Sequence, residues 1–332
     1  MSATGAFLAA PQGPRLSREE ASFFAATNPF GFLIEKRNVE DGEQLAWLVT
    51  ELRAAVGRDA PVFIDREGGR ATRFGIAGWR DFLPAREQVA QNKRGAARAM
   101  YLRHRLMAHE LQALGIDGDF SPVIDLAIPE TEADLAGRCY GDGAVAVAEI
   151  AAFAAEGLID GGVLPVVKHL PGMGRAQVSP MQELPVITAK EKALRVSDFL
   201  AAEAVSGLPI GLVGHAIYRE IDASRPASMS RPVMQIIRQK IGFNGLLIAD
   251  EITTPSLPGS VPERAIKAIG AGADLVRAGG CDHDALSALA DAVGAMPGAA
   301  LKRAEAALAW RRAPLPIDIE AAQEEFQTLM GG

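Results

Sequence analysis

The sequence contains few of the residues that cross-link a chain or anchor it in a membrane. Its 332 residues include two cysteines, Cys139 and Cys281, which have no metal-ligand spacing. No apolar run reaches the length needed to cross a bilayer. These absences exclude a disulfide-stapled domain and a transmembrane protein, and we expect both thiols to stay reduced.

Positive charge is also scarce. The net charge is −7 and no run of Lys and Arg forms a basic stripe, so we expect no nucleic-acid partner. The first basic residue is Arg15, and the apolar stretch 6–10 is too short for the core of a secretion signal. We therefore expect a cytoplasmic protein that binds no membrane.

Short apolar runs alternate with longer stretches of helical spacing along the whole chain. We predict strands at Gly5–Ala9, Gly31–Ile34, Pro61–Asp65, Gly118–Leu126, Leu164–His169, Ile210–His215, Gly245–Asp250 and Ala273–Arg277. Helical stretches lie at Ala99–Leu114, Val145–Ile159, Thr188–Gly207 and Arg231–Ile241. The third of these begins with a Thr-x-x-Glu capping box, from Thr188 to Glu191.

This alternation predicts parallel strands with right-handed crossovers, and hence an α/β fold. Polar residues follow many of the strands instead of gathering at one crevice. That distribution favours a TIM (β/α)8 barrel over the alternative, a doubly wound sheet, because in a barrel all strand ends form one face. With no linker and no repeat, residues 1–332 are predicted to form a single domain.

The segment Asp65-Arg-Glu-Gly-Gly-Arg70 follows the predicted strand that contains Val62-Phe-Ile64. Paired glycines allow a sharp turn and a close approach of the backbone to a ligand, and Arg70 and Arg73 supply planar donors. The alternative is a turn whose aspartate caps backbone amides. The segment lacks the spacing of a phosphate-binding loop.

Lys168 and His169 are the first polar residues after an apolar strand. A buried lysine needs an acid or a ligand hydroxyl, so we expect Lys168 to point into the barrel mouth, either toward a ligand or in a structural salt bridge. His169 can equally orient its loop. His215 ends another strand, although a lone histidine there is more often a packing residue than a catalytic one.

Asp250 and Glu251 follow Gly245-Leu-Leu-Ile-Ala249. A carboxylate at this strand end is well placed to act as a nucleophile or to bind sugar hydroxyls. One of the two can instead cap the next segment, Thr253-Thr-Pro. Both interpretations hold together if Asp250 faces inward and Glu251 faces the loop.

The remaining histidines give no metal site. His104 and His109 are five residues apart and so do not share a helix face in the manner of zinc helices. His283 lies in Cys281-Asp-His-Asp284, where adjacent residues on one loop rarely complete a site. We predict no metal and no cofactor.

Taken in order, the strand-end motifs resemble glycoside hydrolase family 3, and within it the single-domain cytoplasmic β-N-acetylglucosaminidases of peptidoglycan recycling. The resemblance lies in Asn28-Pro-Phe-Gly-Phe-Leu-Ile to Arg37-Asn38, Ile64-Asp-Arg-Glu-Gly-Gly-Arg-Ala-Thr-Arg-Phe74, Asp119-Phe-Ser-Pro-Val-Ile-Asp125, Gly137-Arg-Cys-Tyr-Gly141, Lys168-His-Leu-Pro-Gly172, Gly214-His-Ala-Ile-Tyr218 and Gly242-Phe-Asn-Gly-Leu-Leu-Ile-Ala-Asp250.

The resemblance implies a barrel and a retaining mechanism with Asp250 as the nucleophile. It also implies a small carbohydrate ligand that contains N-acetylglucosamine, held through its hydroxyls. The residues expected to bind this ligand are Asp65, Arg73, Arg138, Lys168, His169 and His215.

The chain departs from the family where proton transfer is expected. The family follows Lys-His-x-Pro-Gly with His-Gly and then Asp-Ser-His, whose Asp and His form the acid/base pair. Here the first position is Met173 and the later three are Ser179, Pro180 and Met181. Before and after the nucleophile stand Ala249, where the family has Ser, and Glu251. Neither Ser nor Met donates a proton usefully near neutral pH.

These departures leave three hypotheses for function. The leading one is a barrel that binds a terminal β-linked N-acetylglucosaminide, such as a muropeptide-like fragment, with hydrolysis impaired. The second is a non-catalytic sugar-sensing or partner-binding protein, whose protein partner the sequence does not identify. The third is an active glycosidase that uses Glu183 as its acid and base. A barrel acting on phosphorylated metabolites is poorly supported, because no Gly-rich phosphate loop is present.

Overall fold

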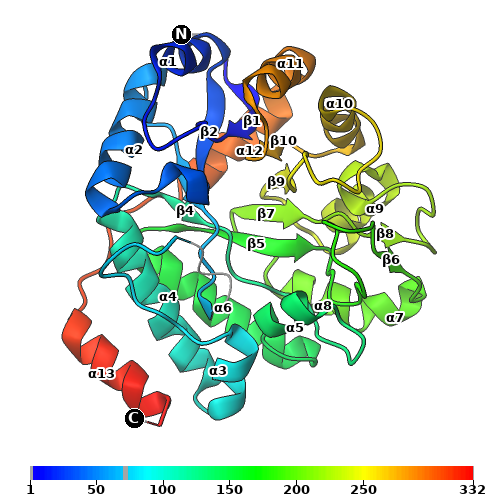
Figure 1. Cartoon of the computed structure of the whole chain (residues 1–332). Coiled ribbons are helices and arrows are strands. Elements are labelled where there is room, and N and C mark those ends of the chain that lie inside the picture. The colour runs from blue at the N-terminus through cyan, green and yellow to red at the C-terminus, as the bar shows by residue number, and fades with distance from the viewer. Residues whose placement is uncertain (1–2, 70–73, 332) are drawn as a thin grey trace.

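Eight parallel strands close into a barrel in the computed structural model, which describes residues 3–69 and 74–331 (Figure 1). Around the barrel the order is β1, β10, β9, β7, β5, β4, β3 and β2, and β2 pairs with β1. These strands are β1 (Gly5–Ala9), β2 (Pro29–Ile34), β3 (Val62–Ile64), β4 (Gly118–Asp119), β5 (Leu164–Leu170), β7 (Ile210–Val213), β9 (Leu246–Ala249) and β10 (Leu275–Ala278). The closed barrel confirms the prediction and excludes the open doubly wound sheet.

Helices surround the barrel on its outer side (Figure 1). They are α1 (Arg18–Thr27), α2 (Gly42–Val56), α3 (Ala85–Gln91), α4 (Ala96–Gln112), α5 (Ala133–Arg138), α6 (Ala144–Asp160), α7 (Glu191–Arg195), α8 (Asp198–Ala204), α9 (Arg231–Gln235), α10 (Val261–Ala271), α11 (His283–Val293), α12 (Gly298–Leu308) and α13 (Ile319–Leu329). Within the described part of the chain, none of them is long and apolar enough to cross a membrane.

One predicted helix is wrong in its beginning and in its length. The Thr188 capping box does not form, since α7 begins after Lys190, which makes no side-chain cap, and a second helix, α8, follows at Asp198. The cause is a pairing that the local sequence does not show. Strand β6 (Val186–Ile187) pairs with β8 (Ile217–Tyr218), and this two-stranded sheet occupies the backbone just before Thr188.

The helix predicted at Arg231–Ile241 also changes character along its length. Ser230 caps α9 by accepting a hydrogen bond from the backbone N–H of Val233. The helix then continues from Ile236 to Lys240 as one π-helical stretch. The element exists as predicted, but its second half has a wider hydrogen-bonding pattern than the sequence indicates.

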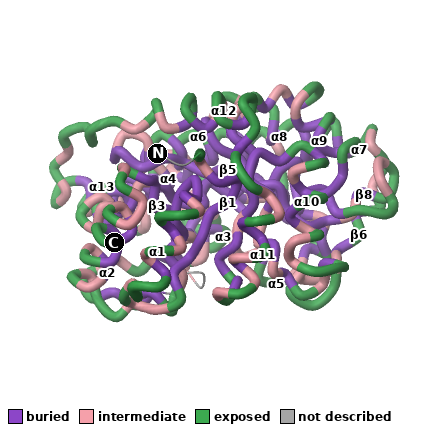
Figure 2. Tube along the Cα trace, turned by 90° about the horizontal axis from the view of Figure 1, so that it is seen from above, coloured by how far each residue is buried: buried purple, intermediate pink, exposed green. Residues whose placement is uncertain are grey.

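The strands alternate in side-chain direction, which separates two cores. One cluster fills the barrel interior and includes Phe63, Val166, Ile248 and Leu275. Residues of the α12 region, Met296, Ala300, Ala304 and Ala307, join this cluster. The larger cluster lies between strands and helices, and buried residues run through the centre of the molecule while exposed ones lie on its rim (Figure 2).

The helix α13 packs on α4 and reaches the segment that follows β3. Phe326 of α13 meets Phe82 edge to face, with ring centroids 5.5 Å apart. Arg80 donates from Nε to Gln323 of α13 at 2.6 Å and from Nη1 to Glu110 of α4 at 2.6 Å. The other Glu110 oxygen lies 2.5 Å from the buried Arg66. These polar contacts hold Arg66 and Arg80, which lie in described parts of the chain between β3 and α3, against α4 and α13.

Candidate active site

The alternation along four strands places four charged residues in one layer at the carboxyl end of the barrel. Asp65, Lys168, Asp250 and Arg277 each lie two residues beyond a side chain of the interior cluster. Because side chains two apart on a strand point the same way, all four point into the barrel mouth. Arg277 contacts both Asp65 and Asp250, and Lys168 contacts Asp65, so the four charged groups share one face of the barrel.

A cluster of two cations and two carboxylates forms one side of this mouth, with Glu67 and Lys168 buried and the other two partly exposed. We call Asp65, Glu67, Arg138 and Lys168 the binding cluster. Lys168 Nζ lies 2.6 Å from Asp65 Oδ1 and 2.5 Å from Glu67 Oε1, and its side chain is 1% exposed. Arg138 donates to both Glu67 oxygens, from Nη2 at 2.6 Å and from Nε at 2.8 Å. The Asp65 side chain is 30% exposed, so it can still accept from a ligand hydroxyl.

The cations of the binding cluster keep its carboxylates ionised. Burial would raise the pKa of Glu67, but the charges of Arg138 and Lys168 outweigh burial and lower it to about 2. Burial would likewise raise the pKa of Asp65, and Lys168, Arg277 and Arg138 hold it far below its usual range. Both carboxylates are therefore hydrogen-bond acceptors at neutral pH.

His169 is oriented by Asp125, a carboxylate that is not among the predicted site residues. Its Nδ1 lies 2.6 Å from Asp125 Oδ2, and the backbone N–H of Met173 donates to Asp125 Oδ1 at 2.5 Å. Asp125 therefore fixes both the imidazole and the turn after β5. This leaves Nε2 of His169 as the ring nitrogen available to a ligand.

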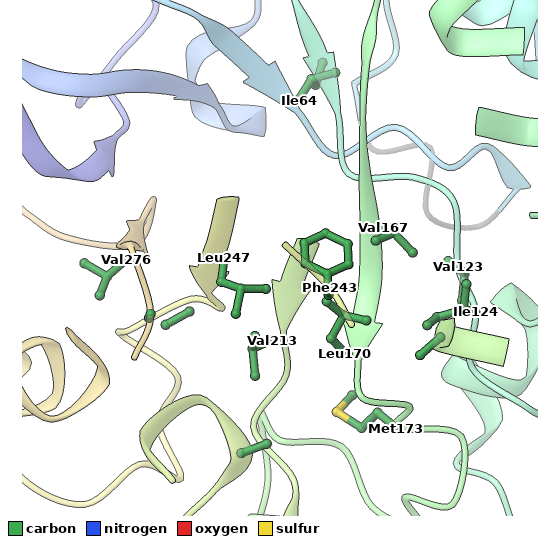
Figure 3. Packing of buried hydrophobic residues seen from close by; sticks show 14 of the residues in the cluster. Ile64, Val123, Ile124, Val167, Leu170, Met173, Val213, Phe243, Leu247 and Val276 are labelled. Atoms are coloured by element: carbon green, nitrogen blue, oxygen red, sulfur yellow. The ribbon is translucent and has the colours of Figure 1, made fainter. Parts of the chain in front are cut away.

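Met173, at which the resemblance implied a loop histidine, is part of the hydrophobic core. Its side chain is 5% exposed and lies beside Leu170 among hydrophobic residues (Figure 3). A Cβ at Gly214 would come within 2.9 Å of Met173 Sδ and 3.2 Å of the Cβ of His169. The glycine thus leaves room for the thioether, and the position has become apolar.

Asp250 lies at the other side of the mouth, across the guanidinium of Arg277. The Arg277 Nη1 atom is 3.1 Å from Asp65 Oδ2 and 3.9 Å from Asp250 Oδ1, so one nitrogen separates the two carboxylates. The Asp250 side chain is 19% exposed. Its Oδ1 accepts from the backbone N–H of Glu251 at 2.7 Å.

Burial would raise the pKa of Asp250, but the positive charges of His215, Arg277 and His169 outweigh it and lower the pKa. An ionised carboxylate at this position has the charge state that a nucleophile needs. Both ring nitrogens of His215 are within hydrogen-bonding distance of protein groups, Nδ1 at 2.7 Å from Ser228 Oγ and Nε2 at 3.0 Å from the Glu251 carbonyl oxygen. The contacts of His215 therefore support the turn that carries Asp250, and burial lowers its own pKa.

Glu251 faces the loop, which is the orientation expected if it caps the next segment while Asp250 faces inward. Its Oε1 accepts from the backbone N–H and the hydroxyl of Thr253, at 3.2 and 2.7 Å. Its Oε2 accepts from the backbone N–H of Gly279 at 2.9 Å. Glu251 thus joins the ends of β9 and β10 and leaves Asp250 as the inward-facing carboxylate.

The loop between β5 and β6 carries the altered proton-transfer positions, and we call residues 177–185 the altered loop. Ser179 and Pro180 are half-buried, whereas Met181 and Glu183 are exposed. The backbone N–H groups of Gln182 and Glu183 donate to the Ser179 carbonyl, which forms a tight turn. Ser256 donates its hydroxyl to the Pro180 carbonyl at 2.5 Å and fastens the altered loop to the segment after β9.

The predicted site residue Arg73 lies outside the described residues. Arg277 and Glu67 were not predicted as site residues. Glu67 comes three residues after β3, and Arg277 lies near the end of β10, so a position close to a strand end was the available signal. His104 is buried and His109 exposed, and no group of His, Cys, Asp or Glu in the described ranges could hold a metal ion.

The chain is similar in sequence and in fold to known proteins. The beta-hexosaminidase of Alkalilimnicola ehrlichii is 31% identical over 280 residues, covering 82% of this chain and 79% of the relative. The structure of NagZ from Neisseria gonorrhoeae in complex with N-trifluoroacetyl-D-glucosamine superposes with a TM-score of 0.84 and 27% identity, covering 99% of this chain and 97% of the other. A family 3 β-N-acetylglucosaminidase from Paenibacillus sp. FPU-7 has the same fold, with a TM-score of 0.88 and 22% identity over 98% of this chain and 66% of that one. Residues 5–305 match the glycosyl hydrolase family 3 N-terminal domain, and the chain belongs to this family.

Proposed function

We propose that the protein binds a terminal β-linked N-acetylglucosaminide, such as a muropeptide-like fragment, and attacks its anomeric carbon with Asp250. The observation that carries this proposal is the pair of carboxylates, Asp65 and Asp250, facing each other across one nitrogen of Arg277. The N-acetylglucosamine derivative bound by the Neisseria gonorrhoeae relative supports the choice of sugar.

The binding cluster supplies the contacts that a sugar ring needs. Asp65 accepts from hydroxyl groups and Arg138 donates to them, and the partners within the cluster fix the direction of both groups. Beside the cluster, His169 donates from Nδ1 to Asp125, so the Nε2 of the neutral ring can accept from a further hydroxyl. Arg138 is 28% exposed, which leaves its guanidinium accessible from the mouth.

The first chemical step needs only Asp250 when the leaving group is good. One carboxylate oxygen bonds to the anomeric carbon, the bond to the leaving oxygen breaks, and that oxygen departs with the electron pair. An ordinary sugar must also receive a proton, and water must then lose one. Met173 is buried in the core, and Ser179 and Met181 cannot transfer protons near neutral pH, so both proton transfers lack their usual residue.

A dinitrophenyl β-N-acetylglucosaminide tests whether Asp250 can attack the sugar without help from a proton donor. We expect a burst of dinitrophenolate followed by a stall, with one sugar added to the peptide that contains Asp250 in mass spectra of the quenched protein. Azide should relieve the stall, because an anionic nucleophile needs no base. Asp250→Asn is the control and should give neither burst nor added mass.

Other outcomes distinguish the rival functions. Calorimetric binding of N-acetylglucosamine without any trapped sugar would identify a non-catalytic sugar-binding protein. Steady cleavage of a disaccharide that Glu183→Gln stops would identify Glu183 as the acid and base. Binding itself should weaken in Arg138→Ala by about 1.5–3 kcal/mol for each charge-assisted bond lost, and no binding at millimolar sugar would contradict the proposed ligand.

A further inference from the structure

Arg277 is the central charge of the barrel mouth, although it belongs to neither the binding cluster nor the altered loop. Its guanidinium lies 3.1 Å from Asp65, 3.3 Å from Glu35, 3.6 Å from Glu251 and 3.9 Å from Asp250. These carboxylates come from the ends of β2, β3 and β9, so one side chain from β10 contacts three other strands.

The position of Arg277 in its strand makes this cation unusual. It follows Leu275 on the inward face of β10, directly above the apolar interior, and its side chain is 11% exposed. The guanidinium lies over the ring of Phe120 at 4.7 Å. An arginine here is stabilised only because carboxylates surround it, and its planar fork can reach several of them at once, which a lysine cannot do.

We propose that Arg277 is a positioning residue that ties the sugar-binding carboxylate of Asp65 to the nucleophile Asp250 and supplies the permanent counter-charge of that nucleophile. The inference rests on the proposed function in one respect, the role of Asp250. The contacts of Arg277 with Asp65 and Asp250 lie within the protein, so their geometry does not depend on any sugar.

The charges around Asp250 distinguish Arg277 from its neighbours. An imidazole carries charge only when protonated, and burial lowers the pKa of His215, so the contribution of that ring to the charge around Asp250 depends on pH. The guanidinium stays charged throughout. The charged and titratable groups that face Asp250 directly or through Arg277 are His215 after β7, His169 on β5, Arg277 on β10, Glu251 on its own segment, Asp65 after β3 and Glu35 after β2.

The ionisation of Asp250 can be measured without any sugar. In protein labelled with carbon-13 at the aspartate carboxyls, the Asp250 resonance is identified by its loss in Asp250→Asn and titrated by NMR. Arg277→Met should move this titration upward by at least about one pH unit, and Arg277→Lys should move it less because the charge remains. An unchanged titration in Arg277→Met would overturn the proposal.

A matched variant at the other end of the barrel, Arg303 on α12, controls for the loss of a paired arginine. Arg303 is bound to Asp274, which directly precedes β10 at the opposite end of the barrel. Arg303→Met should leave the Asp250 titration unchanged. If Arg277→Met fails to fold by circular dichroism, the double variant Arg277→Met with Glu35→Gln keeps the net charge and should show the same upward shift.

Sugar binding tests the tie to Asp65. The Kd for N-acetylglucosamine should rise about tenfold in Arg277→Met and stay unchanged in Arg303→Met. An unchanged Kd in both variants would overturn the tie. If the wild-type protein neither binds nor traps a sugar, the proposed function fails, and the NMR titration still decides whether Arg277 is the counter-charge of Asp250.

Discussion

The binding cluster and the altered loop lie on the same face of the barrel but are connected to the fold in different ways. In the binding cluster Lys168 is 1% exposed, and its ammonium contacts two carboxylates within 2.6 Å. In the altered loop the side chains of Met181 and Glu183 are exposed, and its described hydrogen bonds involve backbone groups or the hydroxyls of Ser179 and Ser256, with no ion pair.

This difference shows that the two regions depend on the fold to different degrees. A buried charge that loses its partner destabilises the whole protein, so the binding cluster is maintained by folding as well as by any ligand. Exposed loop side chains contribute little to stability, so the altered loop can change its proton-transfer groups at almost no cost to the fold. Retention of the binding cluster alone is therefore weak evidence that a sugar is still bound.

The largest expected effect comes from restoring chemistry to the altered loop. The triple variant Ser179→Asp, Pro180→Ser and Met181→His should raise the kcat/KM for a natural disaccharide by roughly 10²–10⁴-fold, the range of general acid–base help. The rate on a dinitrophenyl glycoside should rise far less in its first step, since that leaving group needs no proton. Equal gains on both substrates would contradict the assignment of the deficiency to proton transfer.

Breaking the binding cluster should cost stability even without a ligand. Lys168→Met leaves Asp65 and Glu67 without their shared cation, and we expect the free energy of unfolding in urea to fall by about 3 kcal/mol. The exposed Lys192 on α7 is the matched control, and Lys192→Met should change the value by less than about 0.5 kcal/mol. Equal effects would remove the structural role we assign to the binding cluster.

The binding cluster also predicts a direction for acid sensitivity. The pKa of Glu67 is about 2 in the folded protein and lies near 4.5 in an unfolded chain. The unfolded state therefore binds more protons between these values, so this contribution is complete above about pH 4.5 and is lost as the pH falls toward 2. The Glu67→Gln variant should lose less stability than the wild type over that interval in urea titrations at several pH values.

The smallest effect is expected in the altered loop itself. Glu183 is exposed and close to the turn formed on Ser179, so Glu183→Gln should change the free energy of unfolding by less than about 0.5 kcal/mol. Its effect on the burst with the dinitrophenyl glycoside should be equally small. A loss of disaccharide turnover in this variant would instead show that the loop still carries an acid.

Local patterns predicted the barrel because short apolar runs alternate with helical stretches along the chain, although β3 and β4 are only three and two residues long. They failed at Thr188, where the pairing of β6 with β8 depends on residues thirty positions further along the chain. In the site, the strand-end rule led to Asp65, Lys168 and Asp250 because each directly follows an apolar run. It did not lead to Arg277, since the significance of that residue lies in the carboxylates that three other strands bring to it.

The pairing of β1 with β10 has a consequence for biosynthesis. The five residues of β1 are all buried, yet one of its neighbours is β10, so the chain from Ala9 to Leu275 must be made before that edge is covered. At the usual speed of translation this takes on the order of 10 to 50 s. During that time the nascent chain presents an apolar strand with an unpaired edge, which is a surface that chaperones bind and that neighbouring chains on a polysome can join.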